Sequence, residues 1–205
     1  MNLYERWVLP RLIDLALKNQ EATRHRQGLL PAARGRVLEI GIGSGLNLPF
    51  YGGEVESLVG VDPSEELLAL ARGRLKDAPF AVDLQARSAE ALPFEAKRFD
   101  SAVTTWTLCS VPDAPRALAE LRRVLKPEGA LIFVEHGRAE APGVVAWQDR
   151  LNGLWGRLAG GCNLNRPIAA MIREAGFRIE DLETGHLVKG PRIATYLYRG
   201  RARPL

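Results

Sequence analysis

Segments with the apolar pattern of strands alternate with segments of helical pattern along most of this 205-residue chain. Residues 37–40 and 57–62 are short apolar runs, whereas residues 65–75 and 114–126 carry apolar side chains at helical spacing. Strands that alternate with helices favour a parallel sheet with helices on both faces, because each parallel connection must cross back along the sheet. The length and the 46% content of hydrophobic residues suffice for one such α/β domain.

Seven segments have the strand pattern. In chain order they are residues 37–40, 57–62, 82–88, 99–106, 130–136, 177–184 and 192–200. Pro63 and Ser64 mark the start of the helix at 65–75, and a Pro-Glu-Gly turn ends the helix at 114–126. No linker or internal repeat separates these elements, so we expect residues 1–205 to form a single domain.

Charge and cysteine content exclude several classes of protein. The net charge of +4 is dispersed, and no basic stripe suggests a nucleic-acid partner. Cys109 and Cys162 match neither a disulfide framework nor a zinc-ligand pair, so we expect no metal site and a reducing, cytoplasmic location. Acidic and basic residues interrupt the apolar residues of the first 18 positions, which argues against a signal-peptide core or a membrane span there.

Three glycines at alternate positions, Gly41, Gly43 and Gly45, follow the first strand directly. Glycine serves where the backbone needs a positive φ or where a ligand must approach closer than a Cβ allows. A nicotinamide dinucleotide site needs a third glycine five positions after the first, and Leu46 stands there. Asp62 ends the second strand about twenty residues further on, which is the spacing of an acidic residue that receives ribose hydroxyls.

The pattern E-x-G-x-G-x-G, from Glu39 to Gly45, resembles the first motif of the class I S-adenosylmethionine-dependent methyltransferases. Residues 88–94 look like the loop that borders the adenine in that family. Residues 99–113 look like its fourth strand and the loop beneath the cofactor, and residues 121–136 like the helix, turn and fifth strand that follow. The resemblance implies a Rossmann-like, doubly wound sheet of seven strands with the last strand antiparallel. It also implies S-adenosyl-L-methionine as cofactor and S-adenosyl-L-homocysteine as product.

The same resemblance implies a set of cofactor-binding residues. They are Glu39, Gly41, Ile42, Gly43, Gly45, Asn47, Asp62, Pro63, Ser64, Ser88, Ala89, Glu90, Thr105 and Trp106. Ser88 departs from the family pattern, in which an acidic residue often contacts the adenine amino group. We therefore expect the backbone of Ala89 and the side chain of Glu90 to take over that contact. Trp106 and Glu39 are expected to help hold the cationic sulfonium.

The segments "TLCSV", "EHG" and "GGCNLNRP", with paired tryptophans, are similar to the subfamily of thiol S-methyltransferases and their small bacterial relatives. Animal members carry an N-terminal hydrophobic anchor that this chain lacks, and bacterial relatives are often labelled phospholipid or quinone methyltransferases. We therefore predict methyl transfer to a small apolar acceptor, with a thiol as the leading interpretation. The alternatives are a phospholipid head-group amine or a quinone at the membrane surface, or cofactor binding without catalysis. The resemblance leaves a monomer or a homodimer open.

Residues 1–28 form a predicted helical extension before the first strand. Its apolar residues, with Arg6 and Arg11 nearby, allow two interpretations. The segment could lie on a bilayer as a peripheral contact, or it could cover the active site as a lid. We favour the lid.

Residues 141–166 form a second excursion, which leaves the carboxyl end of the fifth strand, where ligands bind in an open α/β sheet. Six apolar residues fall on one face of a helix there: Val144, Trp147, Leu151, Leu154, Trp155 and Leu158. This face could pack on the domain or wall an acceptor pocket. We predict that Trp147, Trp155, Asn163 and Arg166 bind the acceptor. The plainer alternative for residues 160–167 is a turn with an Asn cap before another helix.

Three residues are candidates for the catalytic chemistry. They are His136, Cys109 and Asp149. His136 could be a general base, because histidine titrates near neutrality, or a structural histidine bonded to the excursion. Cys109 could equally be a small buried residue that packs the loop after the fourth strand. Asp149, beside Trp147, could point into the site or face water.

Overall fold

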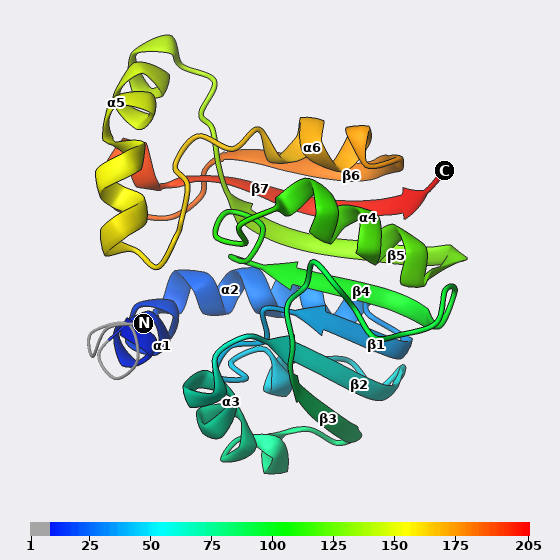
Figure 1. Ribbon diagram of the computed structural model, residues 1–205. Coiled ribbons are helices and arrows are strands. Elements are labelled where there is room, and N and C mark those ends of the chain that lie inside the picture. The colour runs from blue at the N-terminus through cyan, green and yellow to red at the C-terminus, as the bar shows by residue number, and fades with distance from the viewer. Residues whose placement is uncertain (1–8) are drawn as a thin grey trace.

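The computed structural model describes residues 9–205, and its centre is a seven-stranded sheet in the order β3-β2-β1-β4-β5-β7-β6 (Figure 1). The strands are β1 (Gly35–Ile40), β2 (Val55–Asp62), β3 (Ala81–Ala86), β4 (Phe99–Thr105), β5 (Leu125–His136), β6 (Phe177–His186) and β7 (Tyr196–Pro204). Strand β7 is antiparallel to both of its neighbours, and the other neighbouring pairs are parallel. The predicted doubly wound sheet with an antiparallel last strand is confirmed.

Helices cover both faces of the sheet. The described α-helices are α1 (Leu9–Leu17), α2 (Gln20–Leu29), α3 (Glu65–Arg72), α4 (Ala114–Val124), α5 (Pro142–Leu158) and α6 (Ile168–Glu174), and the covering ones are α2, α3, α4 and α6. Successive strand residues point to opposite faces, and β5 shows the result. Leu131 and Phe133 join the core beneath α4 and α6, whereas Ile132 and Val134 join the core beneath α2 and α3.

Several predicted boundaries were wrong. Strand β7 begins at Tyr196, because residues 192–194 form a short 3₁₀ turn after Pro191. Strand β5 begins at Leu125, which pairs with Phe99, so α4 ends at Val124 and the Pro-Glu-Gly sequence lies within an irregular start of the strand.

The N-terminal extension is two helices within the described residues. They are separated at Asn19, whose side chain caps α2 by accepting a hydrogen bond from the Ala22 N–H at 2.8 Å. The first eight residues of the predicted lid lie outside the described part of the chain.

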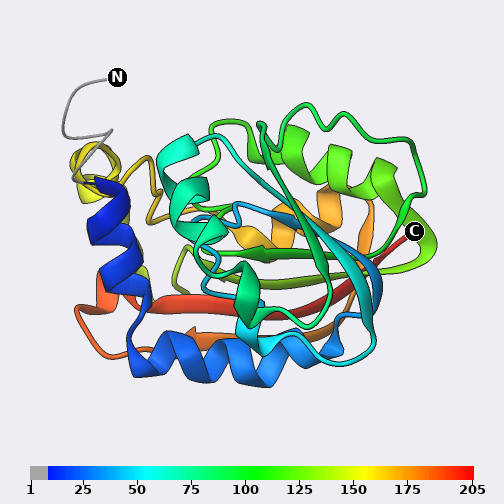
Figure 2. The ribbon, with the colours of Figure 1, turned by 90° about the horizontal axis from the view of Figure 1, so that it is seen from below.

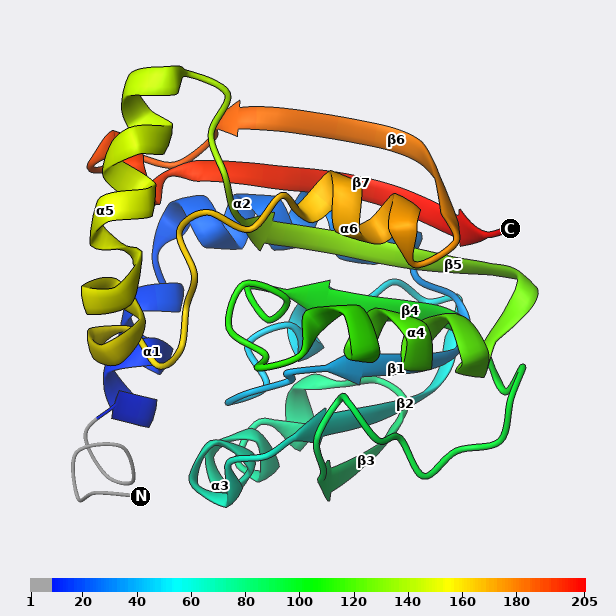
Figure 3. The ribbon, with the colours of Figure 1, turned by 45° about the horizontal axis from the view of Figure 1, so that its top comes forward.

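Helices α1 and α5 stand apart from the two covering layers. Figures 2 and 3 show both at one edge of the molecule, with the C-terminal end of α5 beside α1. The carboxyl ends of the parallel strands lie at this edge, because α5 follows directly on the end of β5. Within residues 9–205, no helix combines the length and apolar character that a membrane span requires.

Candidate functional site

The glycine turn after β1 packs tightly on one side and is open on the other. At Gly41 (φ +64°), a Cβ would come within 2.1 Å of the Thr107 hydroxyl, so only glycine fits there. At Gly43 (φ +55°), a Cβ would meet only the Gly41 carbonyl oxygen, at 3.9 Å. The backbone at Gly43 is therefore accessible to a ligand.

Asp62 joins the end of β2 to this turn. Its Oδ2 accepts a hydrogen bond from the Gly43 N–H at 3.0 Å, and its Oδ1 accepts one from the Ser64 N–H at 2.8 Å. Burial raises the pKa of this carboxyl, while the two N–H groups oppose that rise. Ser64 caps α3 through the Leu67 N–H, as its position predicted. The arrangement fixes the carboxylate in the place where a ribose would be expected.

Glu39 is a fully buried acid beneath the turn. The Tyr51 hydroxyl donates to its Oε2 at 2.6 Å, and the Asn47 amide donates to its Oε1 at 2.7 Å. The same amide also donates to the Thr105 hydroxyl, at 3.0 Å. Burial raises the pKa of Glu39 to about 7. Three predicted site residues, Glu39, Asn47 and Thr105, thus form one network, to which Tyr51 is an addition that the sequence motif did not indicate.

Arg26 is a second residue that sequence reasoning missed. The residue is 3% exposed, and its Nε donates to the Asn47 side-chain oxygen at 2.8 Å. The central carbon of its guanidinium lies 5.2 Å from the centre of the Trp106 ring, and the edge of the His25 ring also packs against Trp106. Burying a charged group costs free energy unless the group is paired. The burial of Arg26 on a polar helix therefore calls for an explanation in terms of structure or function. The Arg-His-Arg run at residues 24–26 is the sequence feature that could have indicated Arg26 as a site residue.

The loop at residues 88–94 holds Ala89 and Glu90, which are expected to contact the adenine. Ala89 is buried, as expected for a residue beside a ligand or a core. The Glu90 carboxylate, however, accepts hydrogen bonds from the Asp113 N–H at 2.6 Å and from the Ser88 hydroxyl at 3.0 Å. Its oxygens are thus held at the start of α4, and contact with an adenine stays a prediction.

Glu135 shapes the loop that follows β4. It is fully buried, and its carboxylate accepts hydrogen bonds from the Thr104 hydroxyl at 2.6 Å, the Thr107 N–H at 3.1 Å and the Cys109 N–H at 3.3 Å. Burial raises its pKa to about 7. The Glu135 carboxylate thus joins the end of β4 to the backbone of the loop that follows it.

A cluster of two thiols, an imidazole and an indole lies beside that loop. The Cys162 sulfur is 3.5 Å from His136 Nδ1, and the Cys109 thiol and the Trp155 ring lie beside it. Hydrogen bonds from Cys109 and from His136 hold the pKa of Cys162 well below its usual value, although burial opposes this. The same pairing, together with burial, raises the pKa of Cys109. His136 Nε2 and Trp155 Nε1 are buried without a hydrogen-bond partner.

The return of the excursion is bonded to the loop after β4. Asn163 donates its backbone and side-chain N–H groups to the Cys109 carbonyl, at 2.7 and 3.1 Å. Arg166 donates to the carbonyls of Leu108, Val111 and Pro112. Gly160 and Gly161 end α5 with φ of +62° and +85°. Residues 160–167 thus form a turn, as the plainer alternative held, but the expected Asn cap was wrong, because Pro167 stands at the N-cap of α6 and no side chain caps that helix.

The structure does not bring all the predicted residues together. Trp147 is 55% exposed, and Asp149 is exposed and bonded to Arg138 at 2.9 Å and Asn165 at 2.7 Å. Of the two interpretations of the apolar face of α5, packing on the domain does not hold for Trp147, Leu154 and Leu158, which are exposed. The helix is instead held by the buried amide of Gln148, which bonds to Gly137, Ala139 and Ile193.

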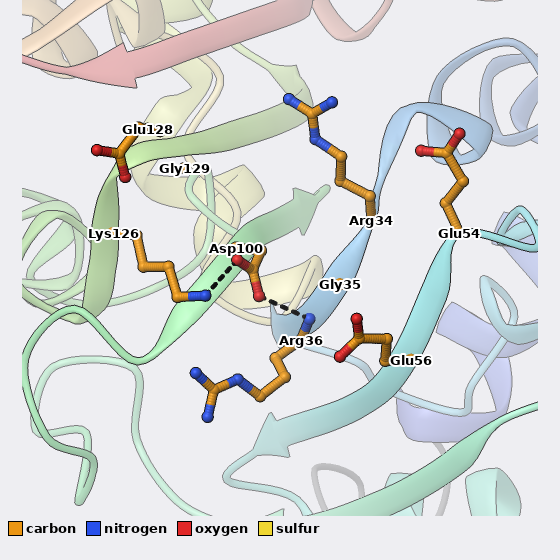
Figure 4. Close-up of a pocket in the computed structure, with 9 residues that line it drawn as sticks. All are labelled: Arg34, Gly35, Arg36, Glu54, Glu56, Asp100, Lys126, Glu128 and Gly129. Carbon is orange, nitrogen blue, oxygen red and sulfur yellow. Dashed lines mark hydrogen bonds and ion pairs between the residues drawn. The ribbon is translucent and has the colours of Figure 1, made fainter.

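A hollow of about 740 Å³ lies at the end of the strands opposite the glycine turn (Figure 4). Residues at the starts of β1, β2, β4 and β5 line it, and the Lys126–Asp100 ion pair crosses it. The Asp100 carboxylate also accepts from the Arg36 N–H. The charged groups that line the hollow hold the starts of these strands together. The residues of the glycine turn lie at the other, carboxyl ends of the strands.

Known proteins share this architecture and these motifs. A family model described as a methyltransferase domain matches residues 38–133. The chain is 34% identical over 137 residues to a phosphatidylethanolamine N-methyltransferase of Cereibacter sphaeroides, covering 65% of this chain and 66% of that one. It is 32% identical over 171 residues to the human thiol S-methyltransferase TMT1A, covering 80% of this chain and 69% of that one. The chain thus spans about two thirds of the length of these relatives.

This chain belongs to the class I S-adenosylmethionine-dependent methyltransferases. A solved structure of the same fold is the N-methyltransferase NodS of Bradyrhizobium japonicum WM9 in complex with S-adenosyl-L-homocysteine, with a TM-score of 0.73, 17% identity and 98% coverage of each chain. The family assignment rests on the sequence relatives, because a likeness at 17% identity shows the fold. The prediction that this chain is a methyltransferase is confirmed. The methyl acceptor differs from one relative to another.

Proposed function

We propose that this methyltransferase binds S-adenosyl-L-methionine at the glycine turn and transfers its methyl group to a small apolar thiol. The buried, unpartnered Nε2 of His136 is the observation that supports an acceptor site, and the similarity to the thiol S-methyltransferase TMT1A favours a thiol there. His136 belongs to a cluster that also holds two thiols and an indole, beside the loop that the family places beneath the cofactor. A buried ring nitrogen without a partner is costly, and an acceptor that bonds to it would remove that cost.

The residues at the glycine turn fit the cofactor. The open backbone at Gly43 would admit its amino-acid portion, and the fixed carboxylate of Asp62 would accept hydrogen bonds from ribose hydroxyls. The buried guanidinium of Arg26 would pair with a carboxylate, which is the anionic group of that amino-acid portion. Trp106 and the Glu39 network would face the cationic sulfonium. When bound, the cofactor supplies a methyl group on an activated sulfonium leaving group.

The chain's own residues would hold the acceptor in line and take its proton. A neutral imidazole with its proton on Nδ1 donates to the Cys162 sulfur and leaves a lone pair on Nε2. That lone pair would remove the proton of an acceptor thiol. Trp155 would supply apolar surface next to it, and the buried thiol of Cys109 would complete that surface.

The N-terminal helices support the lid interpretation. The Asp14 carboxylate on α1 accepts a hydrogen bond from the Ser44 hydroxyl in the glycine turn and forms an ion pair with Arg74 at 2.9 Å. Helix α1 therefore contacts the turn directly, and α2 contributes Arg26 to it. We propose that these helices close over the cofactor and exclude water.

A second candidate acceptor is a phospholipid head-group amine or a quinone. The relative from Cereibacter sphaeroides, named as a phosphatidylethanolamine N-methyltransferase, favours the amine. An amine also has to lose a proton, so His136 would serve either acceptor. A third candidate is cofactor binding without turnover, since a fold by itself does not prove an activity.

Two measurements test the proposal. Calorimetry should show binding of S-adenosyl-L-homocysteine and none of NAD, and Asp62→Ala should weaken that binding by about 1–3 kcal/mol. The exposed Asp83→Ala is the matched control. Purified protein with labelled cofactor should then methylate small apolar thiols in preference to amines, quinones and lipid extracts, and His136→Ala should lose this activity while still binding cofactor. Tight NAD binding would contradict the cofactor assignment, and labelling confined to lipid amines or quinones would replace the thiol.

A further inference from the structure

The exposed apolar side chains of the molecule are gathered on two helices. Seven large apolar side chains are exposed among the described residues, and five of them lie on α1 or α5. These five are Leu12 (48% exposed), Leu15 (70%), Trp147 (55%), Leu154 (60%) and Leu158 (60%). We call them the α1–α5 surface. Single exposed apolar residues are ordinary, but a contiguous group marks an interaction site.

The outer face of α5 has apolar and basic residues in register. Trp147 and Leu154 are seven residues apart and therefore lie on one line along the helix, two turns from each other. Arg150 and Arg157 are also seven apart and form a parallel line on the same exposed side. The Arg150 guanidinium lies 5.7 Å from the centre of the Trp147 ring. An apolar line flanked by arginines is the pattern of a helix that lies in a membrane interface.

Helix α1 extends this surface. Leu12 and Leu15 are exposed on consecutive turns, and Arg11 is exposed beside them. All three ribbon views place α1 beside the C-terminal end of α5, at the edge of the molecule that holds the glycine turn and the His136 cluster (Figures 1, 2 and 3).

We propose that α1, which covers the glycine turn through Asp14, presents its exposed leucines outward, so that the α1–α5 surface docks on the head-group region of an anionic bilayer with the active-site edge turned toward the lipid. Charge complementarity selects this partner, because the basic residues on the surface and the net charge of +4 match an anionic membrane. A second copy of the chain would bring Arg150 and Arg157 against basic residues of the same kind. An apolar acceptor dissolved in the bilayer would then reach the site without crossing water.

Vesicle sedimentation tests the docking without any methyl transfer. The full chain should bind vesicles of phosphatidylcholine with phosphatidylglycerol and bind pure phosphatidylcholine much less, and added salt should release it. Leu15→Glu with Leu154→Glu should weaken binding about tenfold or more, because two apolar anchors become charged. Leu70→Glu is the matched control, since Leu70 is an exposed leucine on α3, outside this surface.

Calorimetry with S-adenosyl-L-homocysteine on the same variants separates this proposal from the proposed function. The double variant should keep its cofactor affinity, which shows that it is folded, and should lose only vesicle binding. Equal vesicle binding by the double variant and wild type would overturn the proposal. The proposal would also be overturned if the wild type were a dimer, the double variant were a monomer and neither protein bound vesicles. The surface would then join two copies of the chain.

Discussion

The guanidinium of Arg26 lies 5.2 Å from the centre of the Trp106 ring, and both side chains border the network around Glu39. The pair joins the second helix of the chain to the end of β4, although 80 residues of sequence separate them. Its position next to the glycine turn gives the N-terminal helices a direct part in the proposed cofactor site.

Arg26→Gln should weaken binding of S-adenosyl-L-homocysteine by about 1.5–3 kcal/mol, the scale of a lost hydrogen bond to a charged group. It should leave binding of 5′-methylthioadenosine nearly unchanged, because that molecule lacks the amino-acid portion. Calorimetry with both ligands measures the difference, and the exposed Arg24→Gln on the same helix is the control. Equal losses for both ligands would show that Arg26 only supports the fold.

Two glycines of one turn should respond differently to alanine. Gly41→Ala should destabilise the fold strongly, because the new Cβ would come within 2.1 Å of the Thr107 hydroxyl at a positive φ. Gly43→Ala meets no such neighbour and should cost about 1–2 kcal/mol of stability, the price of a left-handed backbone for a residue with a Cβ. It should nevertheless reduce cofactor affinity more than any stability loss explains. Urea unfolding and calorimetry on both variants measure the two effects, and wild-type affinity in Gly43→Ala would refute the open-backbone argument.

The sequence predicted the sheet well because periodicity and glycine spacing are local signals. The first glycine, Asp62 and the Ser64 cap all lie where the motif indicates, since each is set by residues within one strand–turn–helix unit. The positions of strand ends were less certain, because β7 is held by pairing with β5 and β6 and not by its own apolar pattern.

Residues brought together across the chain could not be predicted in this way. Arg26 and Tyr51 enter the site through tertiary packing that no spacing encodes. The exposure of Trp147 follows from the orientation of α5, because the buried amide of Gln148 decides which face turns inward. Apolar spacing alone cannot distinguish a helix that packs on the domain from one that presents its apolar face to a partner.

The pH dependence of stability should carry a signature of Glu39. Its pKa rises from about 4.5 in the unfolded chain to about 7 in the folded protein, because burial penalises the carboxylate. The folded state therefore binds more protons between these values, and this contribution to stability is complete below pH 4.5 and is lost as the pH rises toward and through 7. Glu39→Gln cannot titrate, so its stability should fall less over that range, by an amount on the order of 1–3 kcal/mol. Urea unfolding at several pH values measures this, and parallel curves for the two proteins would contradict it.

The Cys162 sulfur should be a thiolate at neutral pH because two donors face it. Hydrogen bonds from Cys109 and His136 lower its pKa, so the ultraviolet absorbance of the thiolate should persist well into the acidic range and be absent in Cys162→Ala. Cys109→Ala removes the donor with the largest effect, so it should move the titration to higher pH. If the thiolate fixes the His136 proton on Nδ1, Cys162→Ala should also lower kcat for a thiol acceptor about tenfold or more while leaving cofactor affinity intact. If the Cys109→Ala variant titrated like the wild type, or if kcat were unchanged in Cys162→Ala, the cluster would have only a packing role.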